Sequence, residues 1–381
     1  MTGEPHVDWD PRSAQVQTDQ VAAYDEMRAR CPVAYSAYRN WTVFRHADIV
    51  RILDDPGTFS NSVSSHLSVP NGMDPPEHTA FRAINDRYFT PGRMREFEPE
   101  CRAVSRQLVG ALGDGLVEIV SELAEPFANR IQCRFMGWPA RLHDPLREWT
   151  RKNREATRAL DREAMSAIAM EFDGYIREQL DERRTLDRPA DVTAELLAER
   201  VNGRPLSDAE LVSLIRNWTV GELSTIAACV GILVSFLAAN PDVQRRLRSE
   251  PDLIGAACDE ILRMRAPLIA NRRRTTEEVT VSGRTIPVGE RVMVLWASAN
   301  RDEGVFGDPD EFRLDRDPDD NLLYGRGIHG CPGAPLARLE LTVLIEELLA
   351  ATDFIEVAVP PGHAAYPAGG FDSVPVSLLR R

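Results

Sequence analysis

The strongest signal for fold and function is the run Tyr324-Gly325-Arg326-Gly327-Ile328-His329-Gly330-Cys331-Pro332-Gly333, in which four of ten residues are glycine. So much glycine indicates a backbone forced into conformations that other residues resist, or pressed against something flat. A helix is predicted from about Ala334 to Ala351, so Cys331 lies just before its N-terminus. The free N–H groups and positive dipole end there favour a thiolate, which suits an axial ligand of haem iron. The alternative for any single cysteine is a buried thiol in a surface loop.

The composition excludes several classes of protein. The 381 residues include 45 Lys+Arg and 59 Asp+Glu, a net charge of −14, which gives no general attraction to nucleic acid or to anionic membrane surfaces. No segment is expected to reach the roughly 20 apolar residues that span a bilayer, and residues 1–20 do not resemble a signal peptide, so we expect a cytoplasmic protein. The six cysteines form no CxxC pair, which argues against zinc or iron–sulfur clusters and against a disulfide framework.

The periodicity of apolar residues predicts a mainly α fold with a minor β portion, as a single domain over 1–381. The segment 208–239 is apolar on all sides and should run through the centre of the molecule. Helices are predicted at 18–31, 98–112, 117–136, 162–184, 208–239, 251–264 and 334–351, with strands within 35–45 and 277–297 and at the C-terminus.

The glycine-rich run resembles the haem-binding signature of the cytochrome P450 family, Phe-Gly-x-Gly-x-His-x-Cys-x-Gly, with Tyr324 where Phe is usual. The resemblance covers essentially the whole chain. It implies the cytochrome P450 fold, haem b (iron protoporphyrin IX) as cofactor, and Cys331 as the axial thiolate ligand of the iron.

A second motif is independent of the first. Glu260-Ile261-Leu262-Arg263 matches the family's Glu-x-x-Arg, and residues three apart share a helix face. Arg316 lies where the family supplies a third member. The resemblance implies a buried network with a structural role in haem retention, whereas such pairs taken alone are usually solvated surface charges.

A third set is expected to hold the two haem propionates. His78 and Arg82 lie one helical turn apart, Arg273 aligns with the arginine before the small strands, and His329 precedes Cys331 by two residues. Cationic donors facing carboxylates form charge-assisted hydrogen bonds. The alternative is that these are four scattered surface residues.

The oxygen-activation motif departs from the family's (Ala/Gly)-Gly-x-(Asp/Glu)-Thr, because the matching stretch is Gly221-Glu222-Leu223-Ser224-Thr225. In this alignment Thr225 lies 35 residues before Glu260, which is a typical separation in the family. The alternative alignment would place Leu223 at the motif's acid position and Ser224 at its alcohol position. Thr225 is then the alcohol, Ser224 can relay a proton but is no acid, and Glu222 could supply the missing acid. Alternatively, Glu222 pairs with an arginine elsewhere.

The resemblance implies a haem-thiolate monooxygenase that activates dioxygen and hydroxylates or dealkylates a small-to-medium apolar or aromatic substrate. Electrons would come from NAD(P)H through a reductase and a ferredoxin-type carrier. A basic face is expected to receive that carrier, formed by Arg82, Arg87, Arg93, Arg326 and Arg338. The pocket walls are expected from 60–73, 217–220, 267–271 and near Phe371, including Leu67, Val69, Val220, Leu268, Ile269 and Phe371.

Three alternatives remain open. The run Leu67–Met73 is similar to a bacterial subgroup that includes self-sufficient P450s with a fused reductase, so the chain could be an isolated haem domain. The substitution of the acid by Ser224 could instead indicate a peroxygenase that uses hydrogen peroxide directly. A haem-binding sensor or carrier without turnover is the third alternative.

Overall fold

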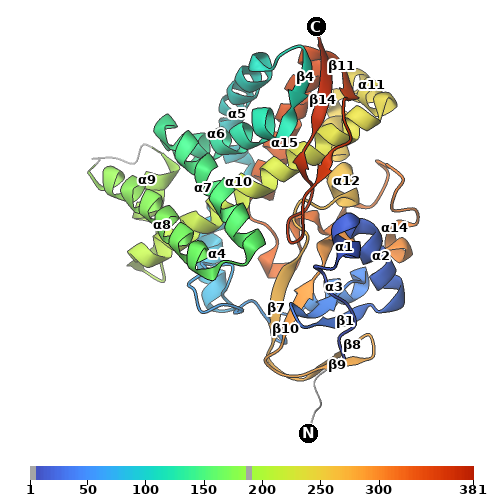
Figure 1. Ribbon diagram of the computed structural model, residues 1–381. Helices are drawn as coiled ribbons and strands as arrows, with labels where there is room; N and C mark the ends of the chain where they lie inside the picture. The colour runs from blue at the N-terminus through green and yellow to red at the C-terminus, as the bar shows by residue number, and fades with distance from the viewer. Residues whose placement is uncertain (1–5, 186–190) are drawn as a thin grey trace.

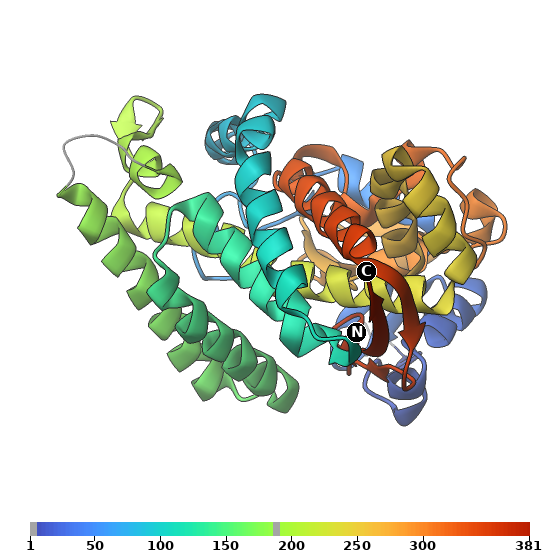
Figure 2. The ribbon, with the colours of Figure 1, turned by 90° about the horizontal axis from the view of Figure 1, so that it is seen from above.

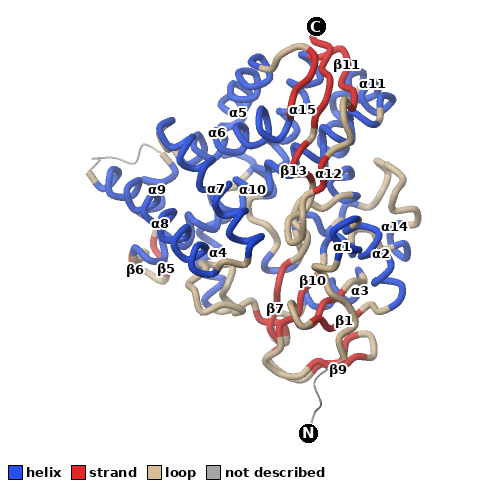
Figure 3. The backbone as a smooth tube through the Cα atoms, in the orientation of Figure 1, coloured by secondary structure: helices blue, strands red, loops and turns tan. Residues whose placement is uncertain are grey.

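Helices make up most of the described part of the chain, residues 6–185 and 191–381 of the computed structural model (Figures 1 and 3). The helices are α1 (Ala14–Thr18), α2 (Gln20–Arg30), α3 (His46–Asp54), α4 (Glu77–Tyr88), α5 (Pro91–Ala111), α6 (Glu125–Met136), α7 (His143–Ala159), α8 (Arg162–Arg184), α9 (Val192–Ala198), α10 (Asp208–Ala239), α11 (Pro241–Ser249), α12 (Ile254–Met264), α13 (Trp296–Ala299), α14 (Glu303–Phe306) and α15 (Ala334–Ala351).

The strands form small sheets at the edges of this helical body. A five-stranded sheet has the order β1-β2-β10-β7-β3, a three-stranded sheet the order β11-β14-β4, and three hairpins complete the set. The strands are β1 (Val33–Ser36), β2 (Asn40–Val43), β3 (Phe59–Ser60), β4 (Gly115–Glu118), β5 (Arg200–Val201), β6 (Arg204–Pro205), β7 (Asn271–Thr275), β8 (Val279–Val281), β9 (Arg284–Ile286), β10 (Arg291–Val294), β11 (Thr352–Val357), β12 (Gly362–His363), β13 (Phe371–Ser373) and β14 (Pro375–Arg380). The prediction of a mainly α fold with a minor β portion is confirmed.

Helix α10 runs through the middle of the molecule, as its all-round apolar sequence predicts (Figures 1 and 2). Its start is set by a capping box, in which Ser207 accepts from the N–H of Glu210 and the Glu210 carboxylate accepts from the N–H of Ser207. It packs against α6, α8, α12 and α15. Every functional residue on α10 is therefore held by rigid neighbours.

The expectation that no segment is long and apolar enough to span a bilayer is wrong. The 32-residue α10 contains a window of mean hydropathy 2.0, which is apolar enough to cross a membrane. In this fold 61% of that window is buried inside the protein. The apolar character of α10 is satisfied by contacts with other helices, as in the central helix of a large core.

Several predicted helices have different boundaries. The segment 98–112 belongs to α5, which already begins at Pro91. The segment 117–136 begins as strand β4, where Val117 lies opposite Val376 of β14, and reaches α6 at Glu125 through a π-helical turn, Val120–Ala124. The segment 18–31 is interrupted at Asp19, whose extended backbone ends α1 and whose carboxylate caps α2 by accepting from the N–H of Ala22. Strand β7 was not predicted, because its sequence is polar and has no alternation of apolar residues. Its strand conformation comes from pairing with β10 and β3, which are distant in the sequence.

The Glu260–Arg263–Arg316 network is present and buried, as predicted. Arg263 is 1% exposed and donates to both carboxylate oxygens of Glu260, with N···O distances of 2.7 and 3.0 Å. Arg316 donates to the same carboxylate at 2.9 Å. Both guanidinium groups also bind backbone carbonyls of the irregular stretch 300–311. The network therefore ties α12 to the segment that leads into the glycine-rich loop.

Replacing Glu260 with Gln should lower the free energy of unfolding by about 3 kcal/mol, because two buried guanidinium groups lose their only counter-charge in this network. Urea denaturation followed by circular dichroism measures the change. Asp242→Asn removes the carboxylate of an exposed pair with Arg245 and should cause no measurable loss. Equal losses in the two variants would contradict a special role for the buried network.

Candidate functional site

A cavity of about 640 Å³ separates the middle of α10 from the glycine-rich loop. On the α10 side it is lined by Gly221, Glu222, Thr225, Ile226 and Cys229, a spacing that follows one face of a helix. On the other side lie Cys331 and the residues around it. The helix that carries the predicted oxygen-activation motif and the loop that carries the predicted iron ligand therefore face each other.

Cys331 lies at the N-terminus of α15, with its side chain exposed to this cavity. Burial by the surrounding protein raises the pKa of its thiol, whereas hydrogen bonds from the N–H groups of Gly333 and Ala334 and the charge of Arg82 lower that pKa. The expected helix-terminus stabilisation of a thiolate is thus present, but burial outweighs it. Cys101, Cys133 and Cys258 are buried away from the cavity, and the described chain contains no disulfide.

Three interactions fix the shape of the loop. The N–H of Cys331 donates to the carbonyl of Tyr324 at 2.7 Å. Gly327 has φ +70°, and a Cβ there would lie 2.6 Å from the carbonyl oxygen of Leu53 in α3, so only glycine fits. Arg82 of α4 donates to the carbonyls of Ile328 and Gly330 at 3.0 and 2.5 Å.

The four predicted propionate donors come together beside this loop. The rings of His78 and His329 have centroids 4.2 Å apart, and Arg82 and Arg273 lie close enough to influence them. Burial, then the charges of His78, Arg273 and Arg82, lower the pKa of His329 to about 3, so it is neutral at pH 7. Both ring nitrogens of His78 and Nε2 of His329 are buried without a hydrogen-bond partner among the described residues.

This cluster fits the carboxylates of a haem. Buried imidazole nitrogens without partners are costly unless something binds them, and arginine and imidazole N–H groups are suitable donors for carboxylate oxygens. The 640 Å³ cavity adjoins the cluster and ends at a thiol, which is the ligand expected for haem iron in this family. The residues present therefore match the group that the sequence implies.

A buried acid that the sequence analysis missed faces Glu222 from the other side. Glu340 of α15 is 0% exposed, and both of its carboxyl oxygens, like Oε1 of Glu222, are buried without a hydrogen-bond partner among the described residues. Burial raises the pKa of both groups, and the charge of Glu222 raises that of Glu340 further. Because two neighbouring buried carboxyl groups are costly to ionise together, this pair favours holding a proton. The signal in the sequence was a single charge in the apolar run 339–345.

The remaining residues of the motif separate in space. Thr225 lines the cavity, whereas Ser224 is not part of its wall, and its hydroxyl donates to the carbonyl of Val220 in its own helix at 3.2 Å. Leu223 is buried in a core cluster. This placement supports the chosen register, with Thr225 as the alcohol. Glu222 lies near Glu340 and forms no ion pair with an arginine within residues 6–185 and 191–381.

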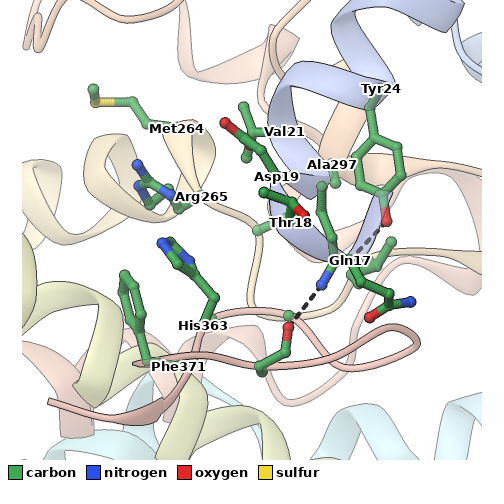
Figure 4. Close-up of a pocket in the computed structure, with 16 residues that line it drawn as sticks. Gln17, Thr18, Asp19, Val21, Tyr24, Met264, Arg265, Ala297, His363 and Phe371 are labelled. Carbon is green, nitrogen blue, oxygen red and sulfur yellow. Dashed lines mark hydrogen bonds between the residues drawn. The ribbon is translucent and has the colours of Figure 1, made fainter. Parts of the chain in front are cut away.

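The expected substrate walls are only partly present. Leu67 and Leu268 line the cavity, but Val69 and Ile269 are buried in the core. Phe371 lies outside it, in a narrow groove beside His363 and the start of α2 (Figure 4). The wall is more polar than predicted and includes Asn61, Asn71, Arg216, Asn217, Asn271 and Arg272.

The predicted basic face is largely neutralised. Each of its arginines has a carboxylate partner: Arg82 with Asp86, Arg87 with Glu199, Arg93 with Glu195, Arg326 with Asp54, and Arg338 with Asp259. Paired charges cancel at a distance, so this surface offers less attraction to an acidic carrier than the sequence suggested.

Comparison with known proteins agrees with the geometry. The family model described as Cytochrome P450 matches residues 134–357. The chain is similar to a "Vitamin D(3) 25-hydroxylase" of Pseudonocardia autotrophica (32% identity, 93% of each chain) and to "Cyclomarin C epoxidase CymV" of Salinispora arenicola (30% identity, 88% of this chain and 89% of that one). The structure of the open cytochrome P450 EryK from S. erythraea has 30% identity and a TM-score of 0.87, covering 95% of this chain and 96% of that one. The chain therefore belongs to the cytochrome P450 family of haem-containing oxidoreductases.

Proposed function

We propose that this chain, acting as one domain in the cytoplasm, is a haem-thiolate monooxygenase that hydroxylates or dealkylates a substrate with a small-to-medium apolar or aromatic body. The observation that carries the proposal is the cavity that Cys331 and the Glu222–Thr225 segment enter from opposite sides. The haem b of the family, when bound, supplies the redox centre at which dioxygen is activated. Electrons would come from NAD(P)H through a separate reductase and a ferredoxin-type carrier.

The chain's own residues bind and orient this cofactor. Cys331 Sγ would bind the iron. Arg82, Arg273, His78 and His329 are the proposed donors to the propionates, and Arg82 also holds the loop through two carbonyls. A neutral imidazole still carries one N–H, so His329 can donate to a propionate from one of its ring nitrogens.

Proton delivery is assigned to Glu222, with Thr225 as the hydroxyl that receives and passes the proton. Glu222 lines the cavity three residues before Thr225, so both lie on the same side of α10. The carboxyl pair with Glu340 keeps a proton available at neutral pH, because burial raises both pKa values. Ser224, which replaces the usual acid, has its hydroxyl engaged with its own helix and is given no direct role.

The position of Glu222 at the cavity also bears on the alternative that the enzyme is a peroxygenase. That alternative was motivated by the missing acid, but the cavity does contain an acid, contributed by Glu222. We therefore expect turnover with dioxygen, NAD(P)H and a ferredoxin–reductase pair to exceed turnover with hydrogen peroxide alone. Measuring both rates on one substrate separates the two functions, and faster turnover with peroxide alone would favour the peroxygenase. Absence of product under both conditions would favour a sensor or carrier.

Cys331→Ser should lose the red-shifted spectrum of the reduced carbon monoxide complex, because that shift requires electron donation from sulfur. Monooxygenase activity should fall to background even where haem is retained. Optical spectroscopy of the purified variant measures both haem content and the shift.

Cys229 provides the matched control, since it also lines the cavity but lies on α10. Cys229→Ala should keep the red-shifted spectrum, with a packing cost of roughly 1 kcal/mol or more. A thiolate spectrum retained in Cys331→Ser, or lost in folded Cys229→Ala, would overturn the assignment of the iron ligand.

Glu222→Gln should reduce turnover with the redox chain about 100-fold while leaving haem content and substrate affinity unchanged. The wild type should lose activity as the pH rises above neutrality, because a carboxyl group with a raised pKa holds its proton only below that pKa. The Glu222→Gln variant should lack this alkaline decline. A pH–rate profile of both proteins measures the difference.

Ser224→Ala is the control for that profile. Its hydroxyl is bonded within α10, so we expect activity within about threefold of the wild type. A large loss in Ser224→Ala, together with an active Glu222→Gln enzyme, would assign proton delivery to Ser224 instead.

A further inference from the structure

Arginines gather where three strands of the five-stranded sheet lie side by side. Arg274 of β7 lies directly opposite Arg291 of β10, and Arg272 is two residues from Arg274 on the same face. Strand β2 pairs with the other side of β10, which brings Arg39, just before β2, to the same end of the sheet. Arg272, Arg274 and Arg291 are exposed on this face. We call these three residues the arginine cluster.

The arginine cluster has no carboxylate partner within salt-bridge distance among residues 6–185 and 191–381, in a chain whose net charge is −14. The side chain of Arg274 donates to the carbonyl of Gly289 at 3.2 Å, and that of Arg291 to the carbonyl of Val63 at 3.4 Å. The nearby carboxylate of Glu290 instead accepts from Asn40. This contrasts with the face around the glycine-rich loop, where Arg82, Arg87, Arg93, Arg326 and Arg338 are all paired.

Like charges directly opposite each other on a sheet are destabilising. This applies to Arg274 and Arg291; Arg272 lies opposite Met293, and its pKa is lowered first by burial and then by the positive charges of Arg39 and Arg291. An anion bound between the guanidinium groups would relieve this repulsion. The cluster is therefore an unfavourable arrangement that a negatively charged ligand would stabilise.

The position of the cluster connects it to the large cavity. Arg272 lines the 640 Å³ cavity that Cys331 enters, with Leu67 and Leu268 among its other walls. Arg274 and Arg291 line an adjoining hollow of about 310 Å³ with Asn40 and Gly289. Val63 borders both spaces. A ligand could thus place an apolar body against Leu67 and Leu268, in the part of the cavity that the haem leaves free, and an anionic end among the arginines.

We propose that the substrate carries an anionic group, a carboxylate or a phosphate, which Arg272, Arg274 and Arg291 bind at the outer end of the cavity. Guanidinium groups suit this task because their planar forks donate two parallel hydrogen bonds to such anions. The haem propionates are a poor alternative ligand for the cluster, since neighbouring residues of a strand point to opposite faces and Arg273 is the one that influences His329. This inference rests on the proposed function, which supplies the reaction.

The test uses the haem-loaded enzyme and three ligands with the same chain: dodecanoate, dodecyl phosphate and 1-dodecanol. Equilibrium dialysis gives each Kd without relying on the spectrum of the iron. Wild-type protein should bind at least one anion about tenfold more tightly than the alcohol, and rising salt should weaken only the anion. Arg272→Gln should raise the Kd of that anion about tenfold and leave that of 1-dodecanol within twofold, with unchanged haem content.

Arg177→Gln is the matched control, because Arg177 is exposed on α8 and has no ion-pair partner within the described chain. It should leave all three Kd values unchanged. The inference is overturned if wild type binds the alcohol as tightly as both anions, if no ligand binds, if Arg272→Gln weakens alcohol and anion equally, or if that variant loses haem. Should the wild type lack the thiolate spectrum but still show Arg272-dependent anion binding, the proposed function fails and the anion site stands.

Discussion

The hydrogen bonds from Arg82 to the carbonyls of Ile328 and Gly330 are the constraint on which the rest of the site depends. A glycine-rich loop has many accessible conformations, so Cys331 can hold one position only if the loop backbone is fixed by neighbouring elements. Arg82 fixes it from α4, and the close approach of Gly327 to Leu53 fixes it from α3. Helix α15 then continues directly from the loop and packs against α5 and α12. The thiol is thereby tied to the helical body that also holds α10.

Charge is distributed in three different ways in this acidic protein. In the network of Glu260, Arg263 and Arg316, two buried guanidinium groups share one carboxylate and bind backbone carbonyls, so the network joins segments that are far apart in the sequence. The arginines around the glycine-rich loop are paired at the surface and contribute little field beyond it. Charged or ionisable groups also lie together without a counter-charge in the Glu222–Glu340 carboxyl pair and in the arginine cluster, and one member of each, Glu222 and Arg272, lines the large cavity. We infer that these groups are kept for function, because their charges lower the stability of the fold at these two places.

Much of the site could be predicted because its residues lie in short local patterns. The glycine-rich run and the helix after it placed Cys331, and the spacing of His78 and Arg82 placed both on one side of a helix. What could not be predicted involves contacts between distant segments. Glu340 meets Glu222 across 118 residues of sequence, and nothing near either residue indicates the other. The partners of the five surface arginines and the true position of Phe371 were unpredictable for the same reason.

The amino-acid sequence by itself predicted the class of fold, the central position of α10 and the iron-ligand candidate, whereas the set of propionate donors came from the resemblance to the cytochrome P450 family. It could do so because helical periodicity, caps and glycine-rich loops are properties of neighbouring residues. Only the tertiary structure decided which acid faces the cavity, which arginines have a carboxylate partner, and how polar the wall of the cavity is. These depend on strand register and helix packing, which set Arg274 opposite Arg291 and Glu222 beside Glu340. Burial and ion pairing then set the pKa and the electrostatic effect of each ionisable group, and neither burial nor pairing can be predicted from one segment alone.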